Sequence, residues 1–139
     1  MREVKKKNYS FSNDEYVSVF IGVCKSQELL DQYLEKDYEL LNEYDCIGFE
    51  LGVDFGINTY DEDFAVFIVN PNMSKDVEEV FADAAVFDTD LLKKDYPDDL
   101  DRPYNTAIVI GKLKYEGEVK EIQNEFGYFK FLGIYPDEY

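Results

Sequence analysis

Two apolar segments of the chain have the residue pattern of β-strands. The stretch Val17–Val23 is rich in β-branched residues, and its alternate positions would share one face of a sheet. Those positions are Val17, Val19, Ile21 and Val23. The stretch Phe64–Val69 is continuously apolar, with an acidic loop before it and Asn70-Pro71-Asn72 after it. This second pattern predicts a central strand buried on both faces, with Phe64 in the core.

Two amphipathic helices are predicted, each after a serine that can cap its first turn. Ser26 precedes an apolar stripe at three- and four-residue spacing, formed by Leu29, Leu30, Tyr33, Leu34, Tyr38 and Leu41. Ser74 precedes a second stripe, formed by Val77, Val80, Phe81, Ala84 and Ala85. The first turn of this second helix would hold carboxylates, which suit the positive end of the helix dipole: Asp76, Glu78 and Glu79.

The segment from Tyr44 to Phe55 has two possible readings. Its apolar residues alternate as in a strand at Ile47, Phe49, Leu51 and Val53. They also stack at four-residue spacing as in a helix, at Ile47, Leu51 and Phe55. Gly48 and Gly52 would each cost about 1 kcal/mol inside a helix relative to alanine. The pattern alone leaves both structures open.

The last third of the chain predicts two more strands, Asn105–Tyr115 and Phe126–Tyr135, with a turn at Glu116-Gly117. A polar connection, Asp88–Pro103, precedes them. The order of elements predicts one α+β domain spanning residues 1–139, with residues 1–13 as a loose arm. We expect a mainly antiparallel or mixed sheet of about four strands, with about three helices packed mostly on one face.

The charge of the chain is strongly negative. Asp and Glu number 31 against 14 Lys and Arg, which gives a net charge of −17. The stretch Gln27–Asp63 holds twelve acids against Lys36 alone, and Asp76–Asp101 holds ten against two lysines. A magnitude of about 2–8 suffices for solubility. Such a field repels nucleic acid and anionic membranes and attracts cationic proteins or metal ions, so we expect a protein partner.

The two cysteines, Cys24 and Cys46, indicate a reducing compartment. No secretory leader and no apolar run long enough to span a membrane is found, so we expect the chain in the cytoplasm with free thiols. Cys24 is followed by Lys25, a context that can lower the pKa of a thiol. A small buried apolar residue is the commoner role of such a cysteine.

The residues needed for most catalytic sites are missing from the sequence. The chain has no histidine, which excludes histidine-based triads and zinc sites. No glycine-rich phosphate loop is present. The runs Asp61-Glu62-Asp63 and Asp98-Asp99-Leu100-Asp101 lack the glycine and distal glutamate of a calcium loop. We therefore predict no enzyme activity, no catalytic residue, no cofactor and no resident metal.

Four segments, in this order, resemble the immunity protein 22 family. They are Val17–Gly22 leading to an acidic helix after Ser26, Asp54–Phe64, Tyr104-Asn105 leading to Ala107–Ile110, and Phe131–Tyr135. The resemblance spans Val17 to Tyr135 and favours a helix in the ambiguous segment. The position before Tyr60 is commonly aromatic in that family and is Thr59 here, which puts the packing of the acidic loop in doubt.

The resemblance implies a cytoplasmic immunity protein of a bacterial polymorphic toxin system, which binds and neutralises a cognate toxin. The acidic charge suggests a basic target such as a nuclease. Loop acids and a neighbouring tyrosine are the candidate partner-binding residues: Tyr60, Asp61, Glu62, Asp63, Asp98, Asp99 and Asp101. Two alternatives stay open, namely a metal-dependent carboxylate hydrolase and a general nucleic-acid mimic.

Overall fold

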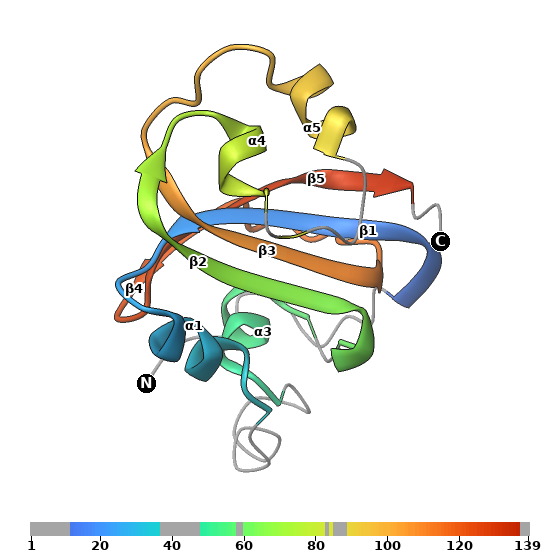
Figure 1. Cartoon of the computed structure of the whole chain (residues 1–139). Coiled ribbons are helices and arrows are strands. Elements are labelled where there is room, and N and C mark those ends of the chain that lie inside the picture. Colours follow the sequence, from blue (N-terminus) through green and yellow to red (C-terminus); the bar gives the residue numbers. More distant parts are fainter. Residues whose placement is uncertain (1–11, 37–47, 58–59, 83, 85–88, 137–139) are drawn as a thin grey trace.

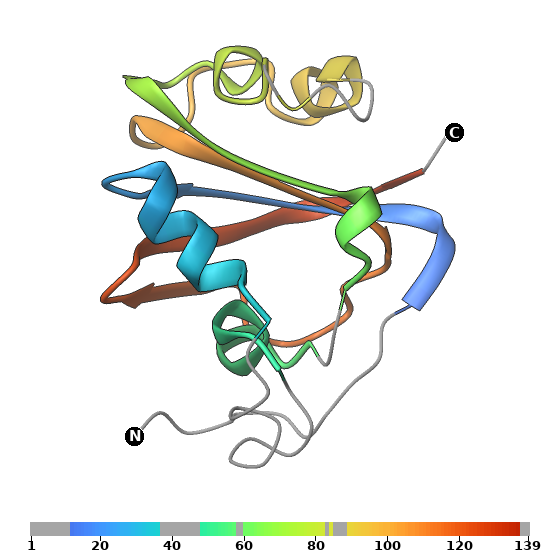
Figure 2. The ribbon, with the colours of Figure 1, turned by 60° about the horizontal axis from the view of Figure 1, so that its bottom comes forward.

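A five-stranded sheet with helices on both faces forms the described part of the chain (Figures 1 and 2). The computed structural model describes residues 12–36, 48–57, 60–82, 84 and 89–136. The strands are β1 Ser12–Val23, β2 Ala65–Ser74, β3 Tyr104–Leu113, β4 Glu121–Asn124 and β5 Gly127–Pro136. The helices are α1 Gln27–Leu34, α3 Glu50–Phe55, α4 Val77–Val80 and α5 Thr89–Asp95, with a 3₁₀ turn η1 at Glu62–Phe64.

The sheet has the strand order β2-β3-β1-β5-β4, and every pairing between these strands is antiparallel. Strand β1 is central, and its Val19 lies opposite Val109 of β3 and Gly133 of β5. The predicted α+β class and antiparallel sheet are confirmed. The fifth strand, β4, was not among the predicted strands. It is only four residues long, and just Ile122 and Asn124 in it are half-buried, so its pattern is weak.

Both faces of the sheet are covered, which corrects the expectation that helices pack mostly on one face. Val17, Val19 and Ile21 of β1 belong to a core cluster with α4 and α5. Phe20 points the other way, into a second cluster with α1 and α3. Figure 2 shows the two helix layers on opposite sides of the sheet. A strand with apolar residues on both faces must be covered on both, because either bare face would expose its apolar side chains to water.

Strand β2 is an edge strand, so its predicted central position is wrong. Its residues Ala65–Asn70 are half-buried rather than buried. Val66 packs on one core cluster and Phe67 on the other, which is why the run is continuously apolar. A continuously apolar strand therefore indicates that both faces of the sheet are covered. It does not indicate how many strands lie beside it.

The helix after Ser26 and the helical reading of the ambiguous segment are both confirmed. Helix α1 starts with Ser26 as its N-cap and ends at Leu34. Tyr38 and Leu41, assigned to its stripe, lie outside the described residues. Helix α3 occupies the second half of the ambiguous segment, and Gly52 is buried within it.

Three boundaries differ from the sequence predictions. Helix α4 is capped by Asp76, whose Oδ1 accepts from the N–H of Glu78, and not by Ser74. Ser74 Oγ instead accepts a hydrogen bond from the N–H of Asp76, the residue just before the helix. The connection predicted to be polar contains α5, with Leu92 buried beneath it. The predicted arm is too long by two residues because β1 begins at Ser12; residues 1–11 lie outside the described chain.

The turn that joins the last two strands follows Asn124, and not Glu116-Gly117 as predicted. Asn124 Oδ1 accepts hydrogen bonds from the N–H groups of Phe126 and Gly127, which closes the turn. Gly127 has φ +146°, and a Cβ there would lie 2.1 Å from the carbonyl oxygen of Val23. Glycine is therefore required where this hairpin passes the end of β1.

Candidate functional site

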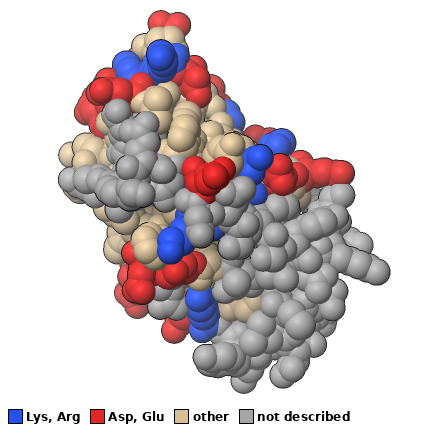
Figure 3. All heavy atoms as spheres, turned by 90° about the vertical axis from the view of Figure 1, so that its right-hand side faces the viewer, with Lys and Arg blue, Asp and Glu red and all other residues tan. Residues whose placement is uncertain are grey.

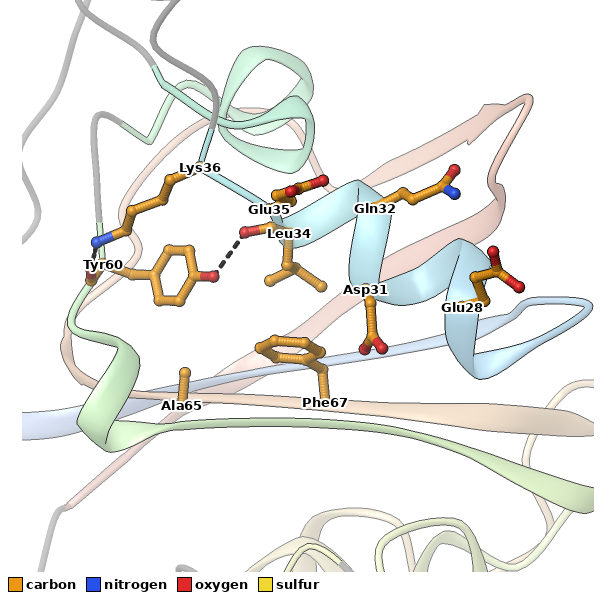
Figure 4. Close-up of a pocket in the computed structure, with 9 residues that line it drawn as sticks. All are labelled: Glu28, Asp31, Gln32, Leu34, Glu35, Lys36, Tyr60, Ala65 and Phe67. Carbon is orange, nitrogen blue, oxygen red and sulfur yellow. Dashed lines mark hydrogen bonds between the residues drawn. The ribbon is translucent and has the colours of Figure 1, made fainter.

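A groove of 660 Å³ lies between α1 and the first half of the edge strand β2. Figure 4 shows the helix along one side of it and the strand along the other. Nine residues line this α1–β2 groove: Glu28, Asp31, Gln32, Leu34, Glu35, Lys36, Tyr60, Ala65 and Phe67. Three of them are carboxylates and one is a lysine, so the groove is acidic at neutral pH.

The acidic wall results from the way α1 packs. Ser26 Oγ accepts a 3.2 Å hydrogen bond from the N–H of Leu29, which fixes the start of the helix. The apolar positions at three- and four-residue spacing are fully buried: Leu30, Tyr33 and Leu34. Positions at the same spacing on another side share the groove wall: Glu28, Asp31 and Glu35. The sequence predicted this stripe but did not single out its acids as a candidate site.

The opposite wall is the free edge of the sheet, and Gln27 of α1 contacts part of it. Gln27 Oε1 accepts a 2.8 Å hydrogen bond from the N–H of Val69. Gln27 Nε2 donates 2.9 Å hydrogen bonds to the carbonyl oxygen of Phe67 and to Asp31 Oδ1. The side-chain amide thus replaces one peptide unit of a neighbouring strand and fixes α1 beside β2.

Tyr60 and Lys36 close one end of the groove. Tyr60 is only 7% exposed, and its hydroxyl donates a 2.6 Å hydrogen bond to the carbonyl oxygen of Leu34 (Figure 4). Lys36 Nζ donates a 2.8 Å hydrogen bond to the Tyr60 carbonyl oxygen and lies 4.9 Å from the centre of its ring. Tyr60, predicted to contact a partner, therefore holds the end of α1 and offers little surface.

The turn η1 forms the rim beyond Tyr60, and it carries the first predicted acidic run. Asp61 and Asp63 are exposed, and Asp61 Oδ1 accepts a 3.0 Å hydrogen bond from the N–H of Asp63. Glu62 begins η1. These residues stand between Tyr60 and Ala65, both of which line the groove, so the acidic turn and the groove are continuous.

Phe64, predicted to lie in the core, is 40% exposed, so that prediction is wrong. It ends η1, one residue before β2 begins, and its carbonyl and Cβ lie against the backbone of Gly111. Its ring faces outward under Lys112, whose Nζ lies 3.9 Å from the ring centre. An exposed aromatic side chain beside two exposed carboxylates is a feature typical of protein interfaces.

The second acidic run lies far from the groove. Leu100 N–H donates to the carbonyl oxygen of Lys75, just after β2 ends, whereas η1 lies just before β2 starts. Ten residues of strand span about 30 Å, so the two runs are at opposite ends of β2. Asp98, Asp99 and Asp101 are exposed, and Asp101 Oδ1 accepts a 2.8 Å hydrogen bond from the Tyr104 hydroxyl. The structure does not bring the two runs together.

Sequence reasoning missed the role of Asp54, a charged residue with only 7% exposure. Its Oδ2 accepts hydrogen bonds of 2.6 Å from the Tyr33 hydroxyl and 2.7 Å from Asn124 Nδ2. These contacts join α3 to α1 and β4. A carboxylate within the apolar helix Glu50–Phe55 was the available signal, because a buried charge needs hydrogen-bond donors.

Cys24 is a free thiol in a buried position. Burial raises the pKa of the Cys24 thiol, and its Sγ lies 3.5 Å from the Ser26 carbonyl oxygen. Cys24 is thus a small buried residue; Cys46 lies outside the described chain. Within the described ranges, no group of three or more acids or cysteines is arranged to hold a metal ion. None of the described helices is long and apolar enough to cross a membrane.

The comparison with protein families decides the affiliation of the chain. The model of the family described as immunity protein 22 matches residues 17–137, which include both walls of the α1–β2 groove. The chain belongs to the immunity protein 22 family. Membership in an immunity protein family associates the chain with toxin neutralisation in general. Such families are generally non-enzymatic. No curated protein and no solved structure matches the chain significantly.

Within this immunity protein 22 chain, the motif Asp54–Phe64 has two parts with different structural roles. Its first part holds the fold together through the buried Asp54 and the turn at Gly56, which has φ +83° and ends α3. In its last part, Asp61, Asp63 and Phe64 are exposed at the rim of the groove. The resemblance in sequence therefore marks both a structural support and a surface.

Proposed function

We propose that this chain binds a cognate bacterial toxin domain in the cytoplasm and neutralises it by covering the surface with which the toxin binds its substrate. The family match supports toxin neutralisation, and the acid-lined α1–β2 groove is the observation that carries the choice of surface. The toxin is basic, and a nuclease fits best, because a protein that acts on nucleic acid needs positive charge where it meets phosphates.

The contact surface consists of the groove wall and the turn at its rim. Asp61 and Asp63 extend the line of carboxylates from α1, and Phe64 adds exposed apolar area beside them. Interfaces commonly combine an aromatic anchor with charged groups that set orientation. Tyr60 supports this surface from behind through its hydrogen bond to the Leu34 carbonyl oxygen.

Charge outside the contact surface speeds the encounter. Asp98, Asp99 and Asp101, about 30 Å away at the other end of β2, add to the field and are not placed in the interface. Figure 3 shows that on one face of the molecule acidic groups alternate with lysine and arginine. The net negative charge attracts a basic partner, and electrostatic steering can raise association rates to roughly 10⁸–10⁹ M⁻¹s⁻¹ at low salt.

Co-expression tests the function. The chain is expressed in bacteria together with the toxin domain encoded by the gene next to its own, and growth is compared with that of cells expressing the toxin alone. Rescue of growth together with a 1:1 complex in size-exclusion chromatography is the expected result. Cells that stop growing in spite of well-folded, abundant chain would show that this toxin is not neutralised by binding to it.

A further inference from the structure

The contacts of Gln27 reveal which way the backbone groups of β2 point. Gln27 bonds the carbonyl oxygen of Phe67 and the N–H of Val69, so both groups face away from β3. In an antiparallel sheet, alternate residues of a strand direct their N–H and C=O groups to the same side. The N–H and C=O of Ala65 and the N–H of Phe67 therefore face outward too, beside the α1–β2 groove that these residues line.

The open part of this edge is short and has defined limits. Towards the end of β2, Gln27 occupies the edge at Val69, and Pro71 has no N–H to offer. Towards its start, η1 turns the chain away at Phe64. An added strand would therefore pair only along Ala65–Phe67. Sheet edges without such protection readily pair with other chains, and here the protection stops at the groove.

Two of the three groove acids of α1, Asp31 and Glu35, are poorly placed for the stability of the helix, whereas Glu28 lies in the first turn, where a carboxylate suits the dipole. Asp31 lies in the last turn and Glu35 is the C-cap, where the negative end of the helix dipole disfavours carboxylates. The last turn contains no basic residue. Glu28 and Asp31, and Asp31 and Glu35, are like-charged pairs at three- and four-residue spacing, which also destabilises a helix. Asp31 also accepts a hydrogen bond from Gln27 Nε2, so the fold accounts for only part of this line of carboxylates.

We propose that a basic extended segment of the toxin adds to the edge of β2 at Ala65–Phe67 and directs alternate lysine or arginine side chains to Glu28, Asp31 and Glu35. Side chains on one face of a strand recur about every 6.6 Å. The seven residue steps from Glu28 to Glu35 span about 10 Å of helix, which fits two such side chains. The apolar stems of the basic residues would lie on Phe67. This inference rests on the proposed function and adds its docking mode.

The test uses a nine-residue peptide probe in which lysine alternates with valine and threonine, added to the ¹⁵N-labelled full chain. Backbone amide shifts are followed by NMR. The expected changes are confined to α1 and to the amides of Ala65 and Phe67, and a peptide with glutamate in place of lysine produces none. Absence of any shift with the lysine peptide, or shifts centred elsewhere, would overturn the docking mode.

A matched pair of variants separates this docking mode from general attraction. The double variant Glu28→Gln, Glu35→Gln removes two charges from the groove, and Glu78→Gln, Glu79→Gln removes two exposed charges from α4 on the other face. The groove variant should weaken binding of peptide and toxin by about tenfold, with little change for the α4 variant. Equal affinities in both variants would overturn the docking mode. If the wild-type chain does not bind the toxin but the peptide shifts stay in the groove, the proposed function fails instead.

Discussion

The Tyr33 hydroxyl donates a 2.6 Å hydrogen bond to Oδ2 of Asp54, which links helix α1 to helix α3 under the sheet. Asn124 Nδ2, from the end of β4, donates to the same oxygen at 2.7 Å. The Tyr33 ring also stacks on Phe129, with ring centres 4.5 Å apart. One buried carboxylate thus fixes the inner side of α1, and the outer side of the same helix carries the acidic wall of the groove.

Replacing Tyr33 with phenylalanine should lower the free energy of unfolding by about 1–3 kcal/mol, because Asp54 loses a donor while it stays buried. Urea unfolding followed by circular dichroism measures the loss. Tyr128→Phe is the control, since its hydroxyl donates to Glu121 at an exposed site and should matter by less than about 0.5 kcal/mol. Equal losses in the two variants would contradict a structural role of the buried pair.

The hydrogen bonds from Gln27 to β2 predict that replacing Gln27 changes the hydrogen exchange of a single backbone amide in addition to the overall stability. In Gln27→Ala the N–H of Val69 loses its 2.8 Å bond, so its hydrogen exchange should become about tenfold faster or more. Gln32→Ala makes the same change one turn further along the helix and should leave Val69 unaffected. Unchanged protection of Val69 in Gln27→Ala would mean that the amide does not hold the edge in solution.

Local sequence patterns predicted the parts of the fold that depend on one segment at a time. The alternation of Val17, Val19 and Ile21 and the cap at Ser26 each specify a strand or a helix start from neighbouring residues. The edge position of β2 could not be read in this way, since it depends on which strands lie beside it. Phe64 was misplaced for the same reason, because its exposure follows from the turn η1 and from Gly111 across the sheet.

The candidate site was predicted only in part. The acidic turn Asp61–Asp63 was singled out for its loop position, and the structure places it at the rim of the groove. The sequence did not single out the acids of α1 as a candidate site. Their relation to Ala65 and Phe67 needs the register between segments more than 30 residues apart, which Gln27 establishes through its bonds to β2.

The exposed position of Phe64 predicts that its roles in stability and in binding can be separated. Phe64→Ala should change the free energy of unfolding by about 1 kcal/mol or less, whereas Phe129→Ala, at a fully buried site, should cost about 3–5 kcal/mol. The same Phe64→Ala chain should bind the toxin more weakly, as calorimetry would show. A loss of stability as large as that of Phe129→Ala would place Phe64 in the core after all.

The buried tyrosines predict a loss of stability at alkaline pH. Burial raises the pKa of Tyr115 to about 12, and its hydroxyl lies within hydrogen-bond distance of two acceptors, the carbonyl oxygens of Phe55 and Val119. Burial also raises the pKa of Tyr104 and Tyr135, each of which donates to a carboxylate. Since a raised pKa means that the folded state holds its protons longer, this stability is complete below pH 10 and is lost as the pH rises towards 12.

Urea unfolding between pH 8 and pH 12 measures this dependence. Each buried phenol contributes a slope of up to about 1.4 kcal/mol per pH unit above pH 10. Tyr115→Phe should make the fall shallower, whatever its effect on stability at pH 8. A free energy of unfolding that stays constant up to pH 12 would show that these hydroxyl groups ionise equally well in the folded chain.

The salt dependence of toxin association tests the central claim most directly, that the chain captures a basic protein through the acid-lined α1–β2 groove. Stopped-flow mixing of the chain with the toxin domain from the neighbouring gene gives the association rate at 20–500 mM NaCl. The account predicts a steep fall with salt in the wild-type chain and a shallower one in Glu28→Gln, Glu35→Gln. A rate that is indifferent to salt, or equal slopes in both chains, would contradict it.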